Sequence, residues 1–364
     1  MKNAICTPAR KTALSLLLYL SASPLLAAER LTDELLTPAE KPSDAWTLNL
    51  YLENDLFTDT DEQYTNGVRA SWVSPEVGNF IDDPQIPQWV RDANRWLTRL
   101  DPEPAPFEND PRHHLIVTLG QEMYTPKDKE RTSVDPDDRP YAGWLYLGFG
   151  YHTQTRHKLK SFQVNLGMIG PWSLAEESQN FIHDLRGFDR FEGWDNQLHN
   201  EPGIQLLYER KQRLFQGGII DNIQHDFIGH IGGSLGNVAT YVNTGAEYRI
   251  GYQLPQDFGT SALRPGGDNS TPGSGDPRFH DQWGVHAFVS IDGRWVLRDI
   301  FLDGNTFRDS HSVDKRPFVA DAAWGVAATY DRWKLSLARY YRTQQFDKQD
   351  GGHKFGSIAL SYSF

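Results

Sequence analysis

Apolar and polar residues alternate with a period of two along much of the chain, the pattern of strands with one apolar face. In residues 46–53, Trp46, Leu48 and Leu50 share a face, and the final segment ends the chain on Phe364. The alternation predicts twelve strands, over 46–53, 65–72, 114–123, 142–152, 158–169, 203–213, 223–235, 238–252, 283–301, 318–330, 332–345 and 355–364.

The segment 283–301 contains Asp292-Gly293, a pair that favours a two-residue hairpin turn. A hairpin would turn Arg294 and Arg298 to the apolar face, where a basic residue costs about 2–4 kcal/mol at the centre of a membrane. A single continuous strand keeps both arginines on the polar face. We therefore expect one long strand and an even strand count.

Composition favours a membrane barrel. No run of about eighteen apolar residues follows residue 30, and mean hydropathy is -0.58, yet 12% of residues are aromatic. A final apolar strand ending on Phe resembles the assembly signal of outer-membrane barrels. We expect an all-β fold, a twelve-stranded antiparallel transmembrane β-barrel of the outer membrane of a Gram-negative bacterium. A sandwich whose edge strand ends on Phe is the alternative.

The first 28 residues have the features of a signal peptide for export, with a basic start, an apolar core and small residues before the expected cleavage near Ala28. The one cysteine, Cys6, falls within this leader. We expect residues 29–364 to form a single barrel domain without thiol chemistry.

Two insertions interrupt the strands, at 75–112 and 254–281. The first contains an apolar stripe that predicts a short amphipathic helix at 87–100. The second is rich in Gly, Pro and Ser, which predicts a mobile loop. Neither carries an evident catalytic set.

If the N-terminus lies in the periplasm, four polar segments meet at the outer rim: LENDLFTDTDEQYTNGVR (52–69), QEMYTP (121–126), DDRPYAG (137–143) and the connection 170–202. Strict alternation turns Asp55 and Thr65 to the lumen and Asn54 to lipid, unless the strand bulges there. We expect the lumen-facing pair to meet His183 inside the barrel mouth.

His183 falls in a segment whose spacing predicts a helix from about Leu174 to Leu185, ended by Gly187. No Ser sits in a G-x-S-x-G elbow, because the match GGSLG (232–236) falls at the end of an expected strand, and no H-E-x-x-H pair offers a zinc site. The clustered Asp, Asn, Gln and Thr supply hard oxygen ligands that suit calcium. A histidine beside such a cation indicates hydrolysis by activated water, with the metal holding the oxyanion.

At LENDLF with YTNG, QEMYTP, DRPYAG, MIGP and QNFIHDLRGFDRFEGWDNQ, the chain resembles the outer-membrane lipid A deacylases, which release the 3'-linked acyloxyacyl chain. The resemblance covers most of the chain after the leader. It implies a calcium-dependent carboxylic ester hydrolase acting on lipid A, or on lipopolysaccharide, at the outer rim. The positions that match the family's site are Asn54, Asp55, Thr65, Gln179, His183 and Asp189.

Within that resemblance, His183 matches the general base, Gln179 a neighbouring polar residue, and Asp55 the best candidate to hold calcium. Asp189 stands where the family has a glutamate, so either Asp189 or Glu192 fills that role. Arg139 in DDRPYAG is a candidate to bind a phosphate of the substrate or to support the site, and a structural ion pair with Asp137 or Asp138 is its alternative.

The net charge of -12 argues against nucleic acid as a partner, and we expect a monomer surrounded by membrane lipids. The alternative is a barrel of the same architecture without enzymatic activity, either a channel or a surface-binding protein whose acidic loops are merely solvated. A phospholipase barrel is a third reading, but no Ser falls beside His183 within the shared motifs.

Overall fold

The computed structural model describes residues 45–54, 63–77, 88, 92, 111–260, 272, 276, 278 and 282–364, with only the backbone described at 63–66. The chain divides into two units, Met1–Lys41 and Pro42–Phe364, and only the second contains described residues. The expected signal peptide lies outside them. The expected helix at 87–100 is described only at Gln88 and Asp92, which are both helical.

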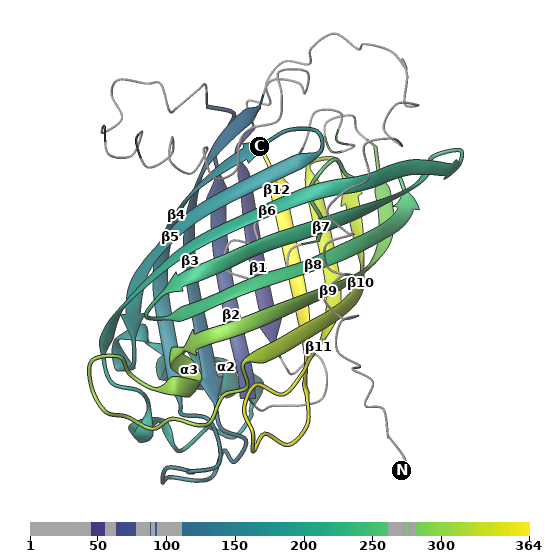
Figure 1. Cartoon of the computed structure of the whole chain (residues 1–364). Helices are drawn as coiled ribbons and strands as arrows, with labels where there is room; N and C mark the ends of the chain where they lie inside the picture. The colour runs from purple at the N-terminus through teal and green to yellow at the C-terminus, as the bar shows by residue number, and fades with distance from the viewer. Residues whose placement is uncertain are drawn as a thin grey trace, which may run out of the picture. The chain divides into compact units, whose positions relative to one another are not determined.

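The second unit is a closed antiparallel barrel in which each strand pairs with its sequence neighbours and the first pairs with the last (Figure 1). Its twelve strands are β1 (Thr47–Asn54), β2 (Gln63–Val73), β3 (Arg112–Thr125), β4 (Ala142–Gln154), β5 (Lys158–Ile169), β6 (Glu201–Ile220), β7 (Ile223–Gly236), β8 (Ala239–Tyr252), β9 (Gly284–Asp299), β10 (Phe318–Tyr330), β11 (Trp333–Arg342) and β12 (His353–Ser363). The twelve-stranded barrel is confirmed. So is the continuous β9, since Asp292 and Gly293 pair with both β8 and β10.

Alternation sorts the side chains into two environments, as the sequence predicts. Leu50, Val68 and Leu147 point outward and remain 44%, 46% and 42% exposed. Asn49 and Arg69, on the opposite face of the same sheet, are both 1% exposed. An apolar outer surface with polar residues in the lumen is the arrangement of a barrel surrounded by hydrocarbon. Among the described residues, no helix has the length and hydropathy needed to cross a membrane.

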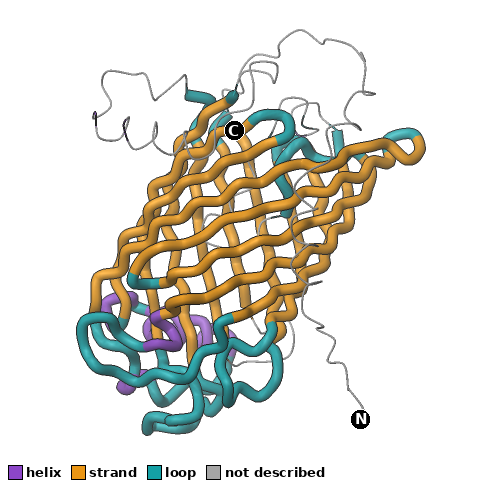
Figure 2. The backbone as a smooth tube through the Cα atoms, viewed as in Figure 1, coloured by secondary structure: helices purple, strands orange, loops and turns teal. Residues whose placement is uncertain are grey.

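The helices whose bounds the structure describes gather at one end of the barrel, opposite the C-terminus (Figures 1 and 2). They are the 3-10 helix η4 (Pro171–Ser173), α2 (Ala175–Arg186), the 3-10 helix η5 (Trp194–Asn196) and α3 (Ile300–Asp303). We call this end, where the odd-numbered strands finish, the helical rim.

At the helical rim, α3 closes the lumen from inside. Ile300, Phe301 and Leu302 are all buried, and the ring of Phe301 stacks on that of Tyr124 at 4.2 Å. The sequence pattern wrongly extended the preceding strand to residue 301. The chain turns into α3 because the Asp299 side chain accepts a hydrogen bond from the Phe301 N–H at 3.0 Å, capping the helix.

The opposite end of the lumen is filled by the segment after β8. Asp257 is fully buried and accepts from Arg249 and Lys334, each at 2.5 Å. Burial raises the pKa of Asp257, but the positive charges of Lys334 and Arg249 lower it by a larger amount, so the pKa lies below its usual range. The Thr260 N–H donates to Glu247 at 2.8 Å. Ion pairs and this hydrogen bond therefore attach Asp257 and Thr260 to the wall, while most of the stretch expected to be mobile lies outside the described residues, and its mobility stays a prediction.

Candidate active site on the outer wall

Helix α2 carries the expected histidine on a buried stripe. Ala175, Gln179 and His183 follow one another at intervals of four residues, and they are 1%, 2% and 2% exposed. Gly187 ends the helix with φ of 70°, a left-handed conformation that glycine adopts without strain. The helix expected from about Leu174 to Leu185 is thus confirmed.

The buried stripe of α2 packs on the outside of the barrel wall. Met123 on β3 and Gly143 on β4 occupy outward positions, out of phase with the lumen-facing residues of those strands. Met123 clusters with Ala175, and a Cβ added at Gly143 would lie 2.3 Å from the Ala175 Cβ. The Gln121 amide also donates to the Ser173 carbonyl at 2.6 Å. The wall itself therefore separates α2 from the lumen.

This placement corrects the expectation that Asp55 and Thr65 meet His183 inside the barrel mouth. Alternation distinguishes the two faces of a strand, but it does not say on which face a later helix packs. Asp55 lies outside the described residues. Thr65 is described only in its backbone, where it is the extra residue of a bulge between the pairs made by Tyr64 and Asn66.

Asn54 is the candidate site residue of β1 that lies on the outer side of the wall. It ends β1 at an outward position, yet it is only 7% exposed. Strand pairing joins Asn54 to Asn66, Asn66 to Met123, and Met123 to Gly143 in one row. The end of β1 therefore lies in the row of wall positions that α2 covers.

The imidazole of His183 is held in one orientation. Its Nδ1 lies 2.6 Å from the Asp189 carbonyl oxygen, and because a carbonyl only accepts, Nδ1 carries the proton and donates. The rings of Phe188 and Phe191 meet the imidazole edge-on at 5.9 and 5.7 Å. In the neutral ring the lone pair is then on Nε2, the atom available to take a proton.

The structure brings the main chain of Asp189 to His183 and leaves its carboxylate in solvent. The Asp189 side chain is 90% exposed, and its Oδ2 lies 3.5 Å from Lys129 Nζ. Glu192 is exposed as well, and its N–H donates to the Lys129 carbonyl at 2.8 Å. The choice between these two carboxylates therefore stays a prediction, and the described contact of Asp189 with the site is its carbonyl.

Gln179 presents a fixed amide beside His183. Its Oε1 accepts from the indole N–H of Trp194 at 2.7 Å, and an indole only donates, so the amide cannot be reversed. Gln179 Nε2 is buried and has no acceptor among the described residues. An unpaired buried donor costs about 1–3 kcal/mol, a cost that a bound ligand oxygen would offset.

A cluster of mainly aromatic residues packs against the buried side of α2. Met123, Tyr141, Phe191 and Trp194 pack together with Ala175, and the rings of Tyr141 and Trp194 lie 5.1 Å apart. Burial raises the pKa of Tyr141 to about 12, so its hydroxyl stays neutral. The sequence pattern does not indicate these supporting residues, because they are distant from one another along the chain, although Trp194 falls within a shared motif.

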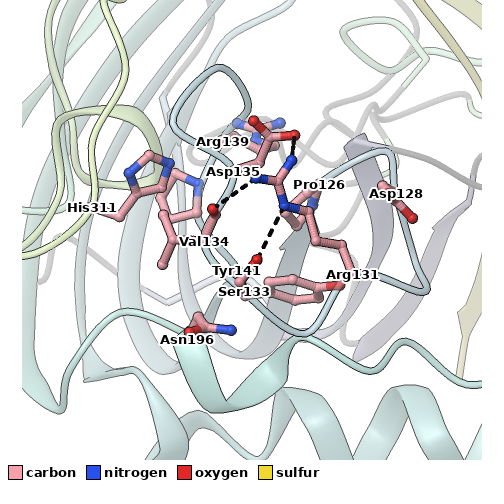
Figure 3. Close-up of a pocket in the computed structure, with 11 residues that line it drawn as sticks. Pro126, Asp128, Arg131, Ser133, Val134, Asp135, Arg139, Tyr141, Asn196 and His311 are labelled. Carbon is pink, nitrogen blue, oxygen red and sulfur yellow. Dashed lines mark hydrogen bonds and ion pairs between the residues drawn. The ribbon is translucent and has the colours of Figure 1, made fainter.

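The loop between β3 and β4 borders this cluster and encloses a small pocket (Figure 3). Arg131 holds the loop by donating to Asp135 at 2.7 Å and to the Val134 carbonyl at 3.1 Å. His311 Nε2 lies 2.7 Å from the Asp138 carbonyl and joins the loop to the connection before β10. The loop is thus fixed beside Tyr141 by its own polar contacts.

Arg139 points into the protein. It is 1% exposed, its guanidinium lies 4.7 Å from the centre of the Tyr124 ring, and its backbone N–H donates to Asp138 at 2.7 Å. Burial lowers the pKa of Arg139, and Asp299 opposes that shift. Asp137 pairs with Lys348 instead. This burial favours a supporting role over phosphate binding, and the substrate-binding role stays a prediction.

Within the described part of the chain, no group of three or more His, Cys, Asp or Glu residues is arranged to hold a metal ion. The candidate ligand Asp55 falls in a gap of that description. Calcium binding accordingly stays a prediction that depends on the β1–β2 connection.

Three solved structures are among those that match this chain. LpxR from Salmonella typhimurium has 17% sequence identity and a TM-score of 0.67, with 87% of this chain and 100% of that chain covered. The β domain of the Bordetella autotransporter BrkA has 8% identity and a TM-score of 0.42 over 88% and 99% of the two chains. The translocator domain of the autotransporter NalP from Neisseria meningitidis has 9% identity and a TM-score of 0.34, over 87% of each chain. The first supports the shared fold, and the other two are too distant to support an argument.

No curated protein matches the chain by sequence. The model of the family described as outer membrane protein LpxR matches residues 14–364. A match over nearly the whole chain, together with the twelve-stranded fold, supports an outer-membrane location. The chain therefore belongs to the LpxR family of outer membrane proteins.

Proposed function

We propose that this protein is a calcium-dependent hydrolase that releases the 3'-linked acyloxyacyl chain of lipid A, with His183 as the general base. The observation that carries the proposal is the imidazole of His183, held by the Asp189 carbonyl on a buried stripe of α2. Its Nδ1 is committed to that carbonyl, which leaves Nε2 to act on water.

In the proposed reaction, Nε2 of His183 takes a proton from a water molecule, and the water oxygen attacks the ester carbonyl carbon. The carbonyl oxygen becomes an oxyanion. When the tetrahedral intermediate collapses, the bond from carbon to the sugar oxygen breaks, and the imidazolium of His183 returns its proton to that oxygen. The products are a fatty acid and a free sugar hydroxyl.

Gln179 is suited to stabilise the oxyanion or to orient the ester, because its buried Nε2 has no acceptor among the described residues. Loss of one oxyanion donor commonly costs about 2.7–4 kcal/mol. Calcium, when bound by Asp55 and neighbouring oxygens, would supply further positive charge to the ester carbonyl. The buried Asn54 lies in the row of wall positions that α2 covers, and it would help to position the substrate.

The channel alternative is disfavoured by the lumen. Described residues lie in it at both ends, with Phe301 against Tyr124 at the helical rim and Asp257 bound to Arg249 and Lys334 at the other. A site on the outer wall is open to membrane lipids without passage through the lumen. A surface-binding barrel without enzymatic activity would share this geometry, so the experiment has to measure turnover.

The test is mass spectrometry of lipid A from cells that express the wild-type chain, His183→Ala or His199→Ala. His199 lies in the same connection and is half-buried, which makes it a matched control. We expect the wild type and His199→Ala to remove the acyloxyacyl chain and His183→Ala to leave lipid A intact. Heat-modifiable electrophoresis confirms that each barrel is folded. An unchanged acyl count with the wild type would refute the proposed reaction.

A further inference from the structure

The face of α2 that points away from the wall is apolar. Leu174, Phe181 and Leu185 are 51%, 66% and 73% exposed, and their spacing of seven and four residues places them on one side of the helix. The buried stripe of Gln179 and His183 lies on the other side. A surface helix normally presents polar residues to water, so this helix has apolar residues where polar ones are expected.

The apolar surface continues beyond both ends of the helix. Trp172, in η4, is 65% exposed, and Phe188, just after the C-cap, is 39% exposed. Arg186 covers part of Phe188, with its guanidinium 5.0 Å from the ring centre. Contiguous exposed apolar surface of this kind marks a site of interaction with protein or membrane.

The position of α2 shows which of these it contacts. The helix lies on the outside of the wall, and directly along β3 and β4 from it are the outward side chains Leu119, Leu147 and Phe149, which are 48%, 42% and 51% exposed. These residues belong to the belt that contacts hydrocarbon in an outer-membrane barrel. Only Gly170 separates the end of β5 from η4. The apolar face of α2 therefore continues the belt.

We propose that the outward face of α2, formed by Leu174, Phe181 and Leu185, together with the exposed ring of Trp172 in η4, is immersed in the membrane leaflet at the helical rim and is covered by lipid acyl chains. Trp172 has the amphipathic ring that is typical of the interface between headgroups and hydrocarbon. The interface between α2 and the wall, where Gln179 and His183 are buried, then lies beside the leaflet. The proposal rests on the geometry of α2 and holds whether or not His183 catalyses ester hydrolysis.

The test uses single cysteines labelled with the fluorophore NBD. The chain has one cysteine, Cys6, and Cys6→Ser provides the background. Phe181→Cys reports on the proposed surface, Leu147→Cys on the belt, and Asp350→Cys on a solvent-exposed loop, since the Asp350 side chain is 86% exposed. Each variant is reconstituted into phosphatidylcholine vesicles, with and without brominated acyl chains, and is also exposed to aqueous iodide.

We expect the label at 181 to behave like the label at 147, with blue-shifted emission, strong quenching by brominated chains and loss of quenching by iodide. The label at 350 should show the opposite pattern. Leu185→Cys repeats the test at a second position in case Phe181→Cys does not fold.

Iodide quenching at 181 and 185 equal to that at 350 would overturn the proposal. Energy transfer between labelled chains that persists on dilution with lipid would overturn it too, because a second copy of the chain would then cover the face.

Discussion

A methyl group at Gly143 would test whether activity requires α2 to lie against the outer wall. In the structure, the added Cβ would lie 2.1 Å from Ser173 Oγ and 2.3 Å from the Ala175 Cβ, whereas carbon atoms in contact are about 3.5–4.0 Å apart. The neighbours are the short segment that begins α2, so relief requires the helix to move outward. Such a shift would carry His183 away from the wall residues without changing the strand pairing of β4.

Overpacking of this kind costs about 1–3 kcal/mol. If this energy destabilises the position of α2 against the wall relative to a displaced position, turnover by Gly143→Ala should fall about 5- to 150-fold, the range that those energies imply. The assay is the time course of lipid A deacylation by mass spectrometry, with electrophoretic heat modifiability as the measure of barrel folding. Limited proteolysis in the connection that contains α2 should accelerate in parallel.

Gly150→Ala on the same strand is the matched control. Its added Cβ would lie 3.4 Å from the Ile116 Cβ and from the Phe162 carbonyl oxygen, which are ordinary contacts. We expect wild-type turnover from this variant. The reasoning is refuted if Gly143→Ala retains wild-type turnover with a folded barrel, or if the two variants lose the same fraction of activity.

Four further predictions concern the site and the lumen. Trp194→Phe keeps most of the ring packing but removes the donor to Gln179, and since one hydrogen bond is worth about 0.5–1.5 kcal/mol, initial rates should fall roughly 2- to 10-fold; an unchanged rate would contradict a fixed amide. A calcium chelator should abolish deacylation and added Ca²⁺ should restore it, whereas indifference to chelation in the mass-spectrometric assay would exclude the metal. Asp257→Asn leaves Lys334 without the carboxylate it pairs with and Arg249 with Asp226 alone; breaking a buried ion pair costs about 3–5 kcal/mol, so the temperature at which the barrel unfolds on gels should drop while turnover at low temperature persists. The pKa of Asp257 is lower in the folded protein than in the unfolded chain. The stability that its carboxylate contributes is therefore complete above about pH 4, the pKa of an unfolded Asp, and is lost as the pH falls toward the folded pKa. A wild-type unfolding temperature that does not fall with acidification would contradict this prediction.

Strand positions were predictable because a membrane barrel imposes a strong period-two pattern. The expected bounds of 318–330 and 158–169 agree with β10 and β5 as observed. The pattern stopped too early for β6, which continues to Ile220 rather than residue 213. Register shifts follow Arg213 and Gly218, and each extra residue reverses the alternation, so the sequence loses its periodic signal while the strands remain paired.

The helix with His183 and Gln179 was predictable for a different reason. Residues at intervals of four share a helical face whatever the surroundings, and Gly187 marks the helix end locally. The contact between Gln179 and Trp194 was not predictable, because the end of α2 and an irregular segment after it separate the two residues along the chain, and only the folding of that segment brings them together. The same holds for the carbonyl of Asp189, whose side chain gave no hint of a backbone role.

The sequence by itself determined that this chain alternates between two environments, that it turns at particular glycines and aspartates, and that Gln179 and His183 lie on one side of a helix. These are local properties, set by backbone geometry and side-chain polarity within a few residues. Only the tertiary structure decided that α2 packs on the outer wall, where Gly143 leaves room for Ala175, and that residues 254–260 bind inside the lumen. Both depend on how distant surfaces fit together, and alternation along a strand carries no record of which face receives a helix.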